Sequence, residues 1–186
     1  MASAEYIRRI TDELAERFGT RDPVEIAQGL NLLYYERADF RELLGMYAVV
    51  NDTGCIFVNG NLTGSTAQMI AAHELGHDRL HRTLAEDGAI WDFQYYDIAG
   101  RQEYEANAFA AQLLLTDEAV MEVLREGYTV TEAAGILGFD ERLLLIKLNE
   151  MKKAGHHLNL SAVPSGDFLR QVRTTDRRMM QEEYYG

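Results

Sequence analysis

Residues 73–77 read His73-Glu74-Leu75-Gly76-His77, an H-E-x-x-H pattern. On a helix, residues four apart lie one turn apart on the same face, so both imidazoles can reach one metal ion. Zinc binds imidazole nitrogens at about 2.0–2.1 Å, and a catalytic zinc site leaves one position for water. Glu74 follows the first histidine, where its carboxylate can take a proton from that water. The pattern therefore predicts a Zn2+ site with His73 and His77 as ligands and Glu74 as general base.

The residues around this stretch indicate a helix that is buried on one side. Ile70, Ala71 and Leu75 recur at helical spacing, so we expect a helix from about residue 65 to residue 81 with an apolar face. The alternative is an ordinary surface helix with two exposed histidines and a glutamate in a salt bridge. The apolar flanks favour the buried helix, as an active-site helix requires.

Two histidines do not complete a catalytic zinc site, since such a site needs a third protein ligand. The next predicted helix, residues 101–115, offers Glu103 and Glu105. Glu103 shares a helical face with Asn107, four residues later, and an apolar face adjoins it. A carboxylate carried alone into an apolar bundle is strongly destabilising, and a zinc ion is a partner that offsets this cost. For Glu105, a solvated acidic face is a reasonable interpretation.

Composition indicates one globular domain, with room for a small helical appendage. The 186 residues include 47% hydrophobic residues and only two prolines, which argues against a disordered or fibrous chain. No stretch approaches the roughly 20 apolar residues of a membrane span, and residues 1–20 show no signal-peptide core. The single cysteine, Cys55, excludes a disulfide framework and is expected to be a small buried side chain. We therefore expect a cytoplasmic protein with no membrane partner.

The order of the predicted elements indicates a small sheet placed before a helical core. The predicted helices cover residues 6–18, 23–29, 65–81, 101–115, 118–126, 131–137 and 141–153, and the predicted strands cover residues 32–35, 45–50 and 55–58. Gly19 is expected to cap the first helix, and Asp22 and Pro23 are expected to begin the second. The stretch 83–100 is predicted to be irregular.

A second motif follows the first along the chain. After His73–His77 come Leu80 and His81, and residues 103–114 read E-x-E-A-N-x-F-A-A-x-L-L. Together these motifs resemble the ImmA/IrrE family of metallopeptidases. Residues 20–27 and the segments that contain Gly45-x-Tyr47 and Ile56-x-Val58-Asn59 also resemble the N-terminal part of that family. The resemblance covers roughly residues 5–150. Thr116 stands where the family often has proline, a departure at a helix end and not at the metal.

The resemblance implies a gluzincin-like site with Glu103 as third ligand and Asn107 behind the ligands. In such sites, Asp or Asn follows the ligand glutamate by four residues and steadies a histidine ligand. Glu103 has this spacing, whereas Glu105 projects about 200° away around the helix. The fold expected is α+β, with a zincin-like, gluzincin-type helical core, a small sheet and a C-terminal helical extension. We expect a metallopeptidase domain over residues 1–116, a helix-turn-helix-like subdomain over 117–160 and a tail of uncertain order over 161–186.

Further polar side chains are candidates for supporting roles. His81 lies one turn beyond His77, but His73 and His81 are about 12 Å apart along the helix, so all three histidines cannot reach one ion. We expect His81 to support the ligands or to pack. An oxyanion-stabilising donor is left open among Tyr95, Tyr96, His156 and His157, for which core packing or a solvated helix end is the alternative.

Residues 129–151 resemble a helix-turn-helix, yet their side chains do not suit DNA. Acidic residues offset the basic ones on the second helix, and leucines dominate it. The formal net charge of the chain is -12, which argues against a protein that neutralises phosphates. We therefore interpret the segment as a packing subdomain or a protein-docking surface, and direct DNA binding is not expected.

Two functions remain open on the sequence. The first is a zinc endopeptidase that hydrolyses a peptide bond in a partner protein, which the resemblance identifies as a helix-turn-helix transcriptional repressor. The second is a non-proteolytic anti-repressor that binds such a partner and keeps a structural metal. An intact Glu74 favours the enzyme, because a structural metal site has no use for a general base. A DNA-binding regulator, a third reading, is disfavoured by the acidic charge.

Overall fold

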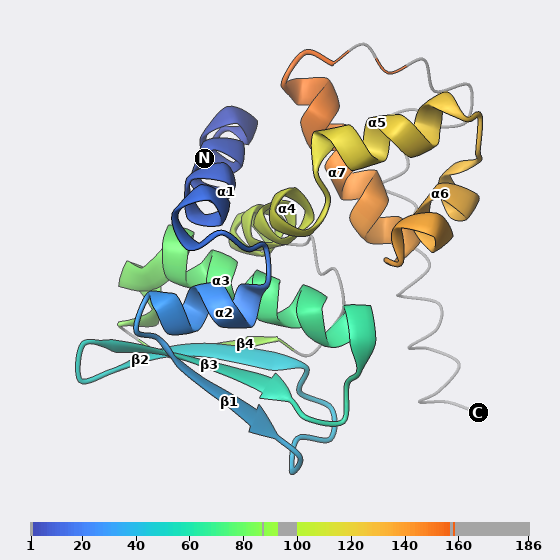
Figure 1. Ribbon diagram of the computed structural model, residues 1–186. Helices are drawn as coiled ribbons and strands as arrows, with labels where there is room; N and C mark the ends of the chain where they lie inside the picture. The colour runs from blue at the N-terminus through green and yellow to red at the C-terminus, as the bar shows by residue number, and fades with distance from the viewer. Residues whose placement is uncertain (1, 87, 93–99, 157, 159–186) are drawn as a thin grey trace.

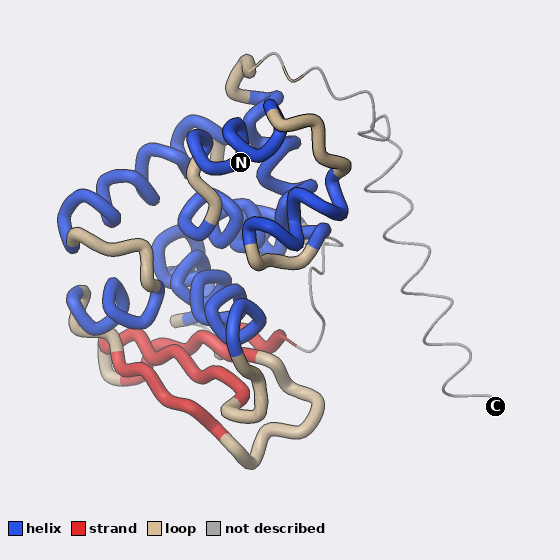
Figure 2. The backbone as a smooth tube through the Cα atoms, turned by 45° about the vertical axis from the view of Figure 1, so that its right-hand side comes forward, coloured by secondary structure: helices blue, strands red, loops and turns tan. Residues whose placement is uncertain are grey.

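The helices of this chain cover one side of a small mixed sheet (Figures 1 and 2). The computed structural model describes residues 2–86, 88–92, 100–156 and 158. Within those residues the elements are α1 (Ala4–Phe18), α2 (Pro23–Gly29), β1 (Leu33–Arg37), β2 (Gly45–Val50), β3 (Thr53–Asn59), α3 (Gly64–Ala85), β4 (Ile90–Asp92), α4 (Arg101–Leu114), α5 (Asp117–Arg125), α6 (Val130–Leu137) and α7 (Glu141–Lys153). The predicted α+β class is confirmed.

The sheet has the strand order β1-β3-β2-β4. β1 runs parallel to β3, whereas β2 is antiparallel to both β3 and β4. Asn51 and Asp52 join β2 to β3 in a two-residue turn, and both have positive φ, as the right-handed twist of a tight hairpin requires. β3 therefore begins at Thr53, two residues earlier than predicted.

β4 was missed in the sequence, where residues 83–100 were predicted to be irregular. It pairs three residues with β2, Gly45 with Asp92, Met46 with Trp91 and Tyr47 with Ile90. A three-residue strand is too short to show an alternating pattern, so only its partner strand defines it. β4 is an edge strand next to α3. β4 carries the Asp92 side chain toward His73 and His77 of α3.

α3 and α4 cross at close range above the sheet (Figure 1). A Cβ built on Gly76 of α3 would lie 3.1 Å from Cβ of Phe109 and 3.2 Å from Cα of Ala106 on α4. Glycine on one helix and alanine on the other therefore let the two backbones approach. α3 is also longer than predicted and continues to Ala85.

A buried polar contact ties α3 to the sheet. The Tyr47 hydroxyl on β2 donates a hydrogen bond of 2.6 Å to Asp78 Oδ1, directly after His77 in α3. Arg82 Nη1, one turn later, donates to the same oxygen at 2.9 Å. Burial first, and then this contact with Asp78, raise the pKa of Tyr47 well above its ordinary value, so the phenol stays a donor at neutral pH. The contact fixes α3 against β2.

The predicted capping of the first two helices is confirmed. Gly19 ends α1 in the left-handed conformation, with φ of 68°. The Asp22 side chain accepts hydrogen bonds from the backbone of Val24 and Glu25, and Pro23 occupies the first turn of α2. Cys55 in β3 is buried, as expected.

α5, α6 and α7 pack beside α4 in one continuous core with the rest of the chain (Figure 1). Most leucines of α7 are buried, among them Leu143, Leu144 and Leu148. Of the two interpretations of residues 129–151, packing fits these side chains better than docking, because they already cover the core. None of the described helices is both long enough and apolar enough to cross a membrane.

The crossing at Gly76 leads to a prediction about stability. We expect Gly76→Ala to be less stable than Gly135→Ala by at least about 1 kcal/mol, because overpacking of a core costs about 1–3 kcal/mol. Gly135 is the matched control, a glycine inside α6 with nothing within 4 Å of a built Cβ. There alanine gains helix propensity of up to about 1 kcal/mol. Urea unfolding of both variants measures the difference, and equal stabilisation would contradict the close crossing.

Candidate metal centre

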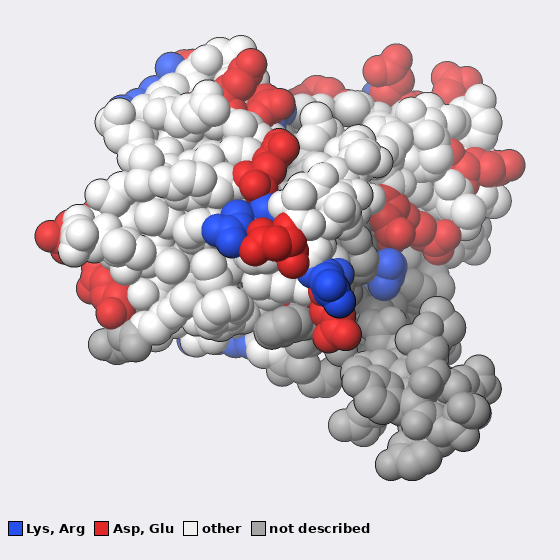
Figure 3. Space-filling model, turned by 90° about the horizontal axis from the view of Figure 1, so that it is seen from below, with Lys and Arg blue, Asp and Glu red and all other residues white. Residues whose placement is uncertain are grey.

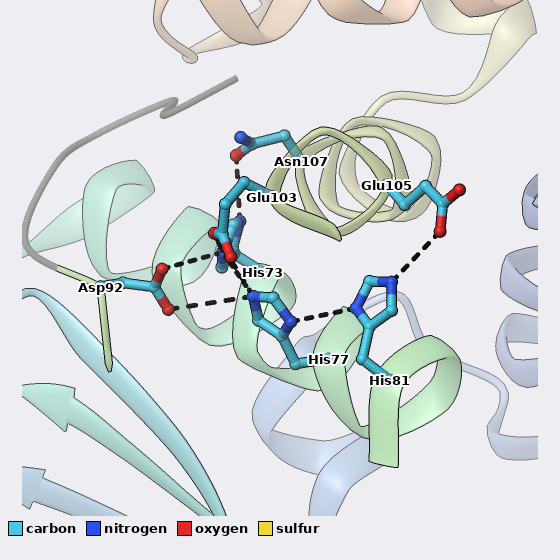
Figure 4. Close-up of polar contacts among 7 residues, drawn as sticks. All are labelled: His73, His77, His81, Asp92, Glu103, Glu105 and Asn107. Carbon is cyan, nitrogen blue, oxygen red and sulfur yellow. Dashed lines mark hydrogen bonds and ion pairs between the residues drawn. The ribbon is translucent and has the colours of Figure 1, made fainter. Parts of the chain in front are cut away.

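The three predicted ligands converge between α3 and α4 (Figure 4). The Nε2 atoms of His73 and His77 lie 3.0 Å apart. Glu103 Oε2 lies 3.3 Å from His73 Nε2 and 3.6 Å from His77 Nε2. Ligand atoms that share a tetrahedral zinc ion at about 2.0–2.1 Å are about 3.3 Å apart, so these separations suit one ion. The structure brings the three side chains together, and their role as ligands stays a prediction.

Carboxylate oxygens without a hydrogen-bond partner gather at the same point. Among the described residues they include both oxygens of Glu74, Oδ2 of Asp92 and Oε2 of Glu103, all buried. Burying such oxygens unpaired is costly, and each one in a native structure calls for an explanation. Two imidazoles with carboxylates form a donor set that suits a divalent zinc ion. Both the type of donor atoms and the distances between them therefore suit a bound divalent metal ion.

Glu74 lies against the backbone of β2. A Cβ built on Gly45 would lie 2.1 Å from Glu74 Oε1 and 2.7 Å from Ile70 Cγ2, so no other residue type fits there without displacing the carboxylate. The Glu74 side chain is fully buried. The carboxylate thus lies against the sheet, where Gly45 provides the space for it, and the charges of His73, Asp92 and Glu103 act on it.

His73 is oriented by a hydrogen bond from behind. Its Nδ1 lies 3.0 Å from Asn107 Oδ1, and both side chains are buried. Because an amide oxygen only accepts, Nδ1 carries the proton, and Nε2 keeps its lone pair for a metal. Asn107 therefore lies where the family resemblance implied, one turn after Glu103 on the same face of α4.

His77 is supported by a chain of side chains that ends on α4 (Figure 4). Its Nδ1 lies 3.0 Å from His81 Nδ1, and His81 Nε2 lies 3.2 Å from Glu105 Oε2. If His81 donates from Nε2 to this carboxylate, its Nδ1 accepts from His77, which again leaves the His77 Nε2 lone pair free. His81 is thus a supporting residue, and the expectation that it is not a ligand agrees with its position.

The interpretation of Glu105 as a solvated acidic residue is wrong. Glu105 is buried, and its Oε1 accepts hydrogen bonds of 2.9 Å from Arg101 Nε and from the backbone N–H of Ala2. Burial opposes its charge, but the contacts with Arg101 and His81 lower the pKa of Glu105. Glu105 does point away from Glu103 around the helix, yet α1 and the end of α3 cover that side of α4. Nothing in the local sequence of α4 reveals such cover.

Asp92 is the side chain that the sequence did not identify. Its Oδ1 lies 3.6 Å from His73 Nε2 and its Oδ2 lies 3.9 Å from His77 Nε2. With His73, His77 and Glu103 it forms a group of four whose ligand atoms all lie within 4.8 Å of one another. Strand alternation points Asp92 inward and its neighbour Trp91, which is 56% exposed, outward. The only available signal was an acidic residue after two apolar ones.

Electrostatics at the site follow from burial and crowding. Burial, and next the Asp92 carboxylate, raise the pKa of Glu74 well above its ordinary value. Burial lowers the pKa of His77. Burial works against the charge of His73, but contacts with Asp92 and Glu103 raise the pKa of His73. Shifts of this kind, produced by desolvation together with specific partners, are typical of functional sites.

The candidate oxyanion donors are only partly accounted for. Tyr95, Tyr96 and His157 lie outside the described residues. His156 Nε2 lies 3.1 Å from Asp117 Oδ2 at the start of α5, which makes it a partner of that carboxylate. The described residues therefore assign no oxyanion role to His156.

Comparison with known proteins agrees with this geometry. A sequence profile of the IrrE N-terminal-like domain matches residues 31–148, which include β1 to β4, α3 and α4. The chain belongs to the ImmA/IrrE family of metallopeptidases. Membership in this family implies a peptidase that uses a divalent metal.

Two curated relatives match a larger share of the chain than the profile does. The chain is 26% identical over 151 residues to "Uncharacterized immunity region protein 2" of Bacillus phage phi105, an alignment that covers 78% of this chain and 92% of the phage protein. It is 25% identical over 149 residues to "Metallopeptidase ImmA" of Bacillus subtilis (strain 168), covering 78% of this chain and 85% of that protein. The family resemblance noted in the two motifs is thus confirmed.

Metal content provides a test of the ligand set. We expect about one divalent ion per wild-type chain, and we expect Glu103→Gln to lose most of it on dialysis because a direct ligand is removed. Glu105→Gln should retain more metal than Glu103→Gln, because Glu105 reaches the proposed ligand His77 only through His81. The exposed Glu122→Gln is the control with wild-type content. Elemental analysis after dialysis measures the ratio, and wild-type metal in Glu103→Gln would remove Glu103 from the ligand set.

Proposed function

We propose that this chain is a zinc-dependent endopeptidase in which His73, His77 and Glu103 hold the metal and Glu74 is the general base. The observation that carries the proposal is Glu74, which is fully buried and has no hydrogen-bond partner among the described residues. Its carboxylate lies close enough to His73, Asp92 and Glu103 for their charges to act on it. A metal site that serves only the fold has no use for such a carboxylate. A gluzincin-type, zincin-like arrangement is part of the same proposal.

The chain's own residues supply positioning and proton transfer. A bound zinc ion would lower the pKa of a water molecule and polarise the peptide carbonyl. Glu74 takes the proton from the attacking water at a carboxylate oxygen and delivers it to the leaving amine. Asn107 and His81 hold the two histidine ligands in one tautomer, so that both Nε2 lone pairs face the metal. Burial raises the pKa of Glu74 above its ordinary value, which makes the carboxylate a stronger proton acceptor.

A non-proteolytic anti-repressor with a structural metal is the second candidate, and one observation favours it. Asp92 lies with the three predicted ligands, and four protein ligands are typical of a closed, structural zinc site. Glu74 argues against this alternative. A closed structural site does not need a general base, and a buried carboxylate without a hydrogen-bond partner destabilises the fold.

The proposed substrate is a helix-turn-helix transcriptional repressor. The support comes from the relatives' names, an immunity region protein of a phage and the metallopeptidase ImmA, which fit a protein substrate in a repressor system. Direct binding to DNA is not part of the proposal. The leucines of α7 are buried, and on the face seen in Figure 3 the described lysines and arginines form no broad patch.

Glu74→Gln tests the catalytic assignment. We expect the variant to keep its metal, because Glu74 is not among the proposed ligands, and to lower peptide cleavage by about 10²-fold or more, the typical contribution of base catalysis. The measurement pairs metal analysis with the rate of substrate cleavage by gel. A variant that cleaves at a rate close to wild type would exclude Glu74 from the mechanism.

Cleavage of a repressor tests the substrate. We expect the metal-loaded chain to cut the helix-turn-helix repressor encoded beside it at a single site, and a chelator to abolish the reaction. Mass spectrometry of the products identifies the bond. Weak activity on casein does not weigh against the proposal, because an unregulated endopeptidase would damage its host. Binding without cleavage, unchanged by Glu74→Gln, would favour the non-proteolytic anti-repressor.

A further inference from the structure

Asp92 gives the candidate metal centre one carboxylate more than a hydrolytic site needs. We propose that Asp92 is a fourth protein ligand of the bound metal and that, in the chain without substrate, it fills the coordination position that a catalytic site leaves to water. This proposal rests on the proposed function, since it concerns the metal held by His73, His77 and Glu103. It makes the resting chain a latent peptidase.

The backbone pairing of β4 directs the Asp92 side chain toward the two histidines of the candidate metal centre. Asp92 pairs with Gly45 at the end of the β4–β2 ladder, and its carbonyl accepts a hydrogen bond of 2.8 Å from the backbone N–H of Leu44. The alternation of the strand turns Trp91 to the outside and Asp92 toward α3. These backbone contacts with β2 define the position of Asp92. Figure 4 shows its side chain pointing toward His73 and His77.

The distances from the Asp92 oxygens to the two histidine nitrogens are short enough for Asp92 to be a ligand of the same ion. Its two oxygens are 3.6 Å from His73 Nε2 and 3.9 Å from His77 Nε2. Glu103, the proposed third ligand, lies at the comparable distances of 3.3 and 3.6 Å from the same two atoms. Both carboxylates therefore face the same point from different elements, Glu103 from α4 and Asp92 from the sheet.

Burial makes a metal the fitting partner for this carboxylate. Asp92 is only 8% exposed, and its Oδ2 has no hydrogen-bond partner among the described residues. Two carboxylates with two neutral imidazoles balance the charge of a divalent cation, whereas Asp92 left off the ion would be a buried, unpaired charge. Glu74, the third carboxylate of the cluster, stays beside the site as the base.

A four-ligand site has a direct consequence for activity. Structural zinc sites use four protein ligands, and catalytic sites use three with one position open. Hydrolysis by this chain therefore requires Asp92 to leave the metal first. Among the described residues, β4 is a three-residue edge strand that pairs with β2 alone, so Asp92 comes from a different element than the ligands on α3 and α4.

The test measures access to the metal without any measurement of cleavage. The chain is loaded with Co2+, which is visible spectroscopically where d10 zinc is not, and titrated with acetohydroxamate, a small chelator that needs open coordination positions. We expect Asp92→Asn and Asp92→Ala to bind acetohydroxamate at least about tenfold more tightly than wild type, as the loss of a competing ligand requires. Asp92→Asn keeps the backbone pairing with β2, which guards against loss of the fold.

Asp52→Asn is the matched control. It removes one carboxylate from the β2–β3 turn of the same sheet, and asparagine tolerates the φ of 62° found there. We expect wild-type acetohydroxamate affinity in this variant. We also expect zinc affinity, measured against a competing chelator, to fall in both Asp92 variants and to stay unchanged in Asp52→Asn.

The outcomes separate this proposal from the proposed function. Equal acetohydroxamate affinity in wild type and both Asp92 variants overturns the role of Asp92, and Glu74-dependent cleavage then still supports the peptidase. Tighter acetohydroxamate binding in the Asp92 variants supports the fourth ligand even if no variant cleaves a protein. If acetohydroxamate binds the Asp92 variants more tightly and no variant cleaves a protein, the endopeptidase proposal fails. The chain is then a binding protein with a closed metal site.

Discussion

Gly76 and Ala106 let the backbones of α3 and α4 approach one another, and this approach sets the distances of the metal centre. With the helices at this separation, Glu103 on α4 reaches the His73 and His77 nitrogens on α3. A bulkier side chain at the crossing would separate the helices and move the carboxylate away from both imidazoles. The glycine inside the H-E-x-x-H stretch thus serves helix packing, while the residues around it are the proposed ligands and base.

The second constraint is electrostatic. Three carboxylates and two imidazoles share a small buried volume, and the described residues supply no lysine or arginine contact to Glu74, Asp92 or Glu103. Such a cluster is stable with a divalent cation and strained without one. Metal binding is therefore expected to be linked to the stability of the α3–α4 pair, because a metal that binds the folded chain stabilises it by mass action.

The sheet contributes the two features that decide between a catalytic and a structural metal. β2 provides the space at Gly45 that the Glu74 carboxylate occupies, and β4 carries Asp92 to the histidines. A buried carboxylate such as Glu74 is expected in a hydrolase, where it is the general base. Four protein ligands are typical of a closed, structural metal site. A peptidase whose fourth position is held by its own edge strand reconciles the two observations, because it is closed at rest and complete once the strand moves.

What the sequence determined by itself is local. The spacing of His73, Glu74 and His77 fixes one helical face, and the spacing of Glu103 and Asn107 fixes another, because helical geometry depends only on residues close in the chain. Two helix ends were predictable for the same reason, the end of α1 at Gly19 and the start of α2 at Asp22. Two motifs of this kind were enough to indicate the ImmA/IrrE family.

Only the tertiary structure decided which distant groups meet at those faces. Asp92 enters the site because a three-residue strand pairs with β2, a pairing that leaves no periodic signal in the sequence. Glu105 is buried because α1 and His81 cover it, and not because of anything in α4. In both cases the deciding contacts join residues far apart in the chain, and the fate of a carboxylate depends on the charges and the cover that those contacts bring to it.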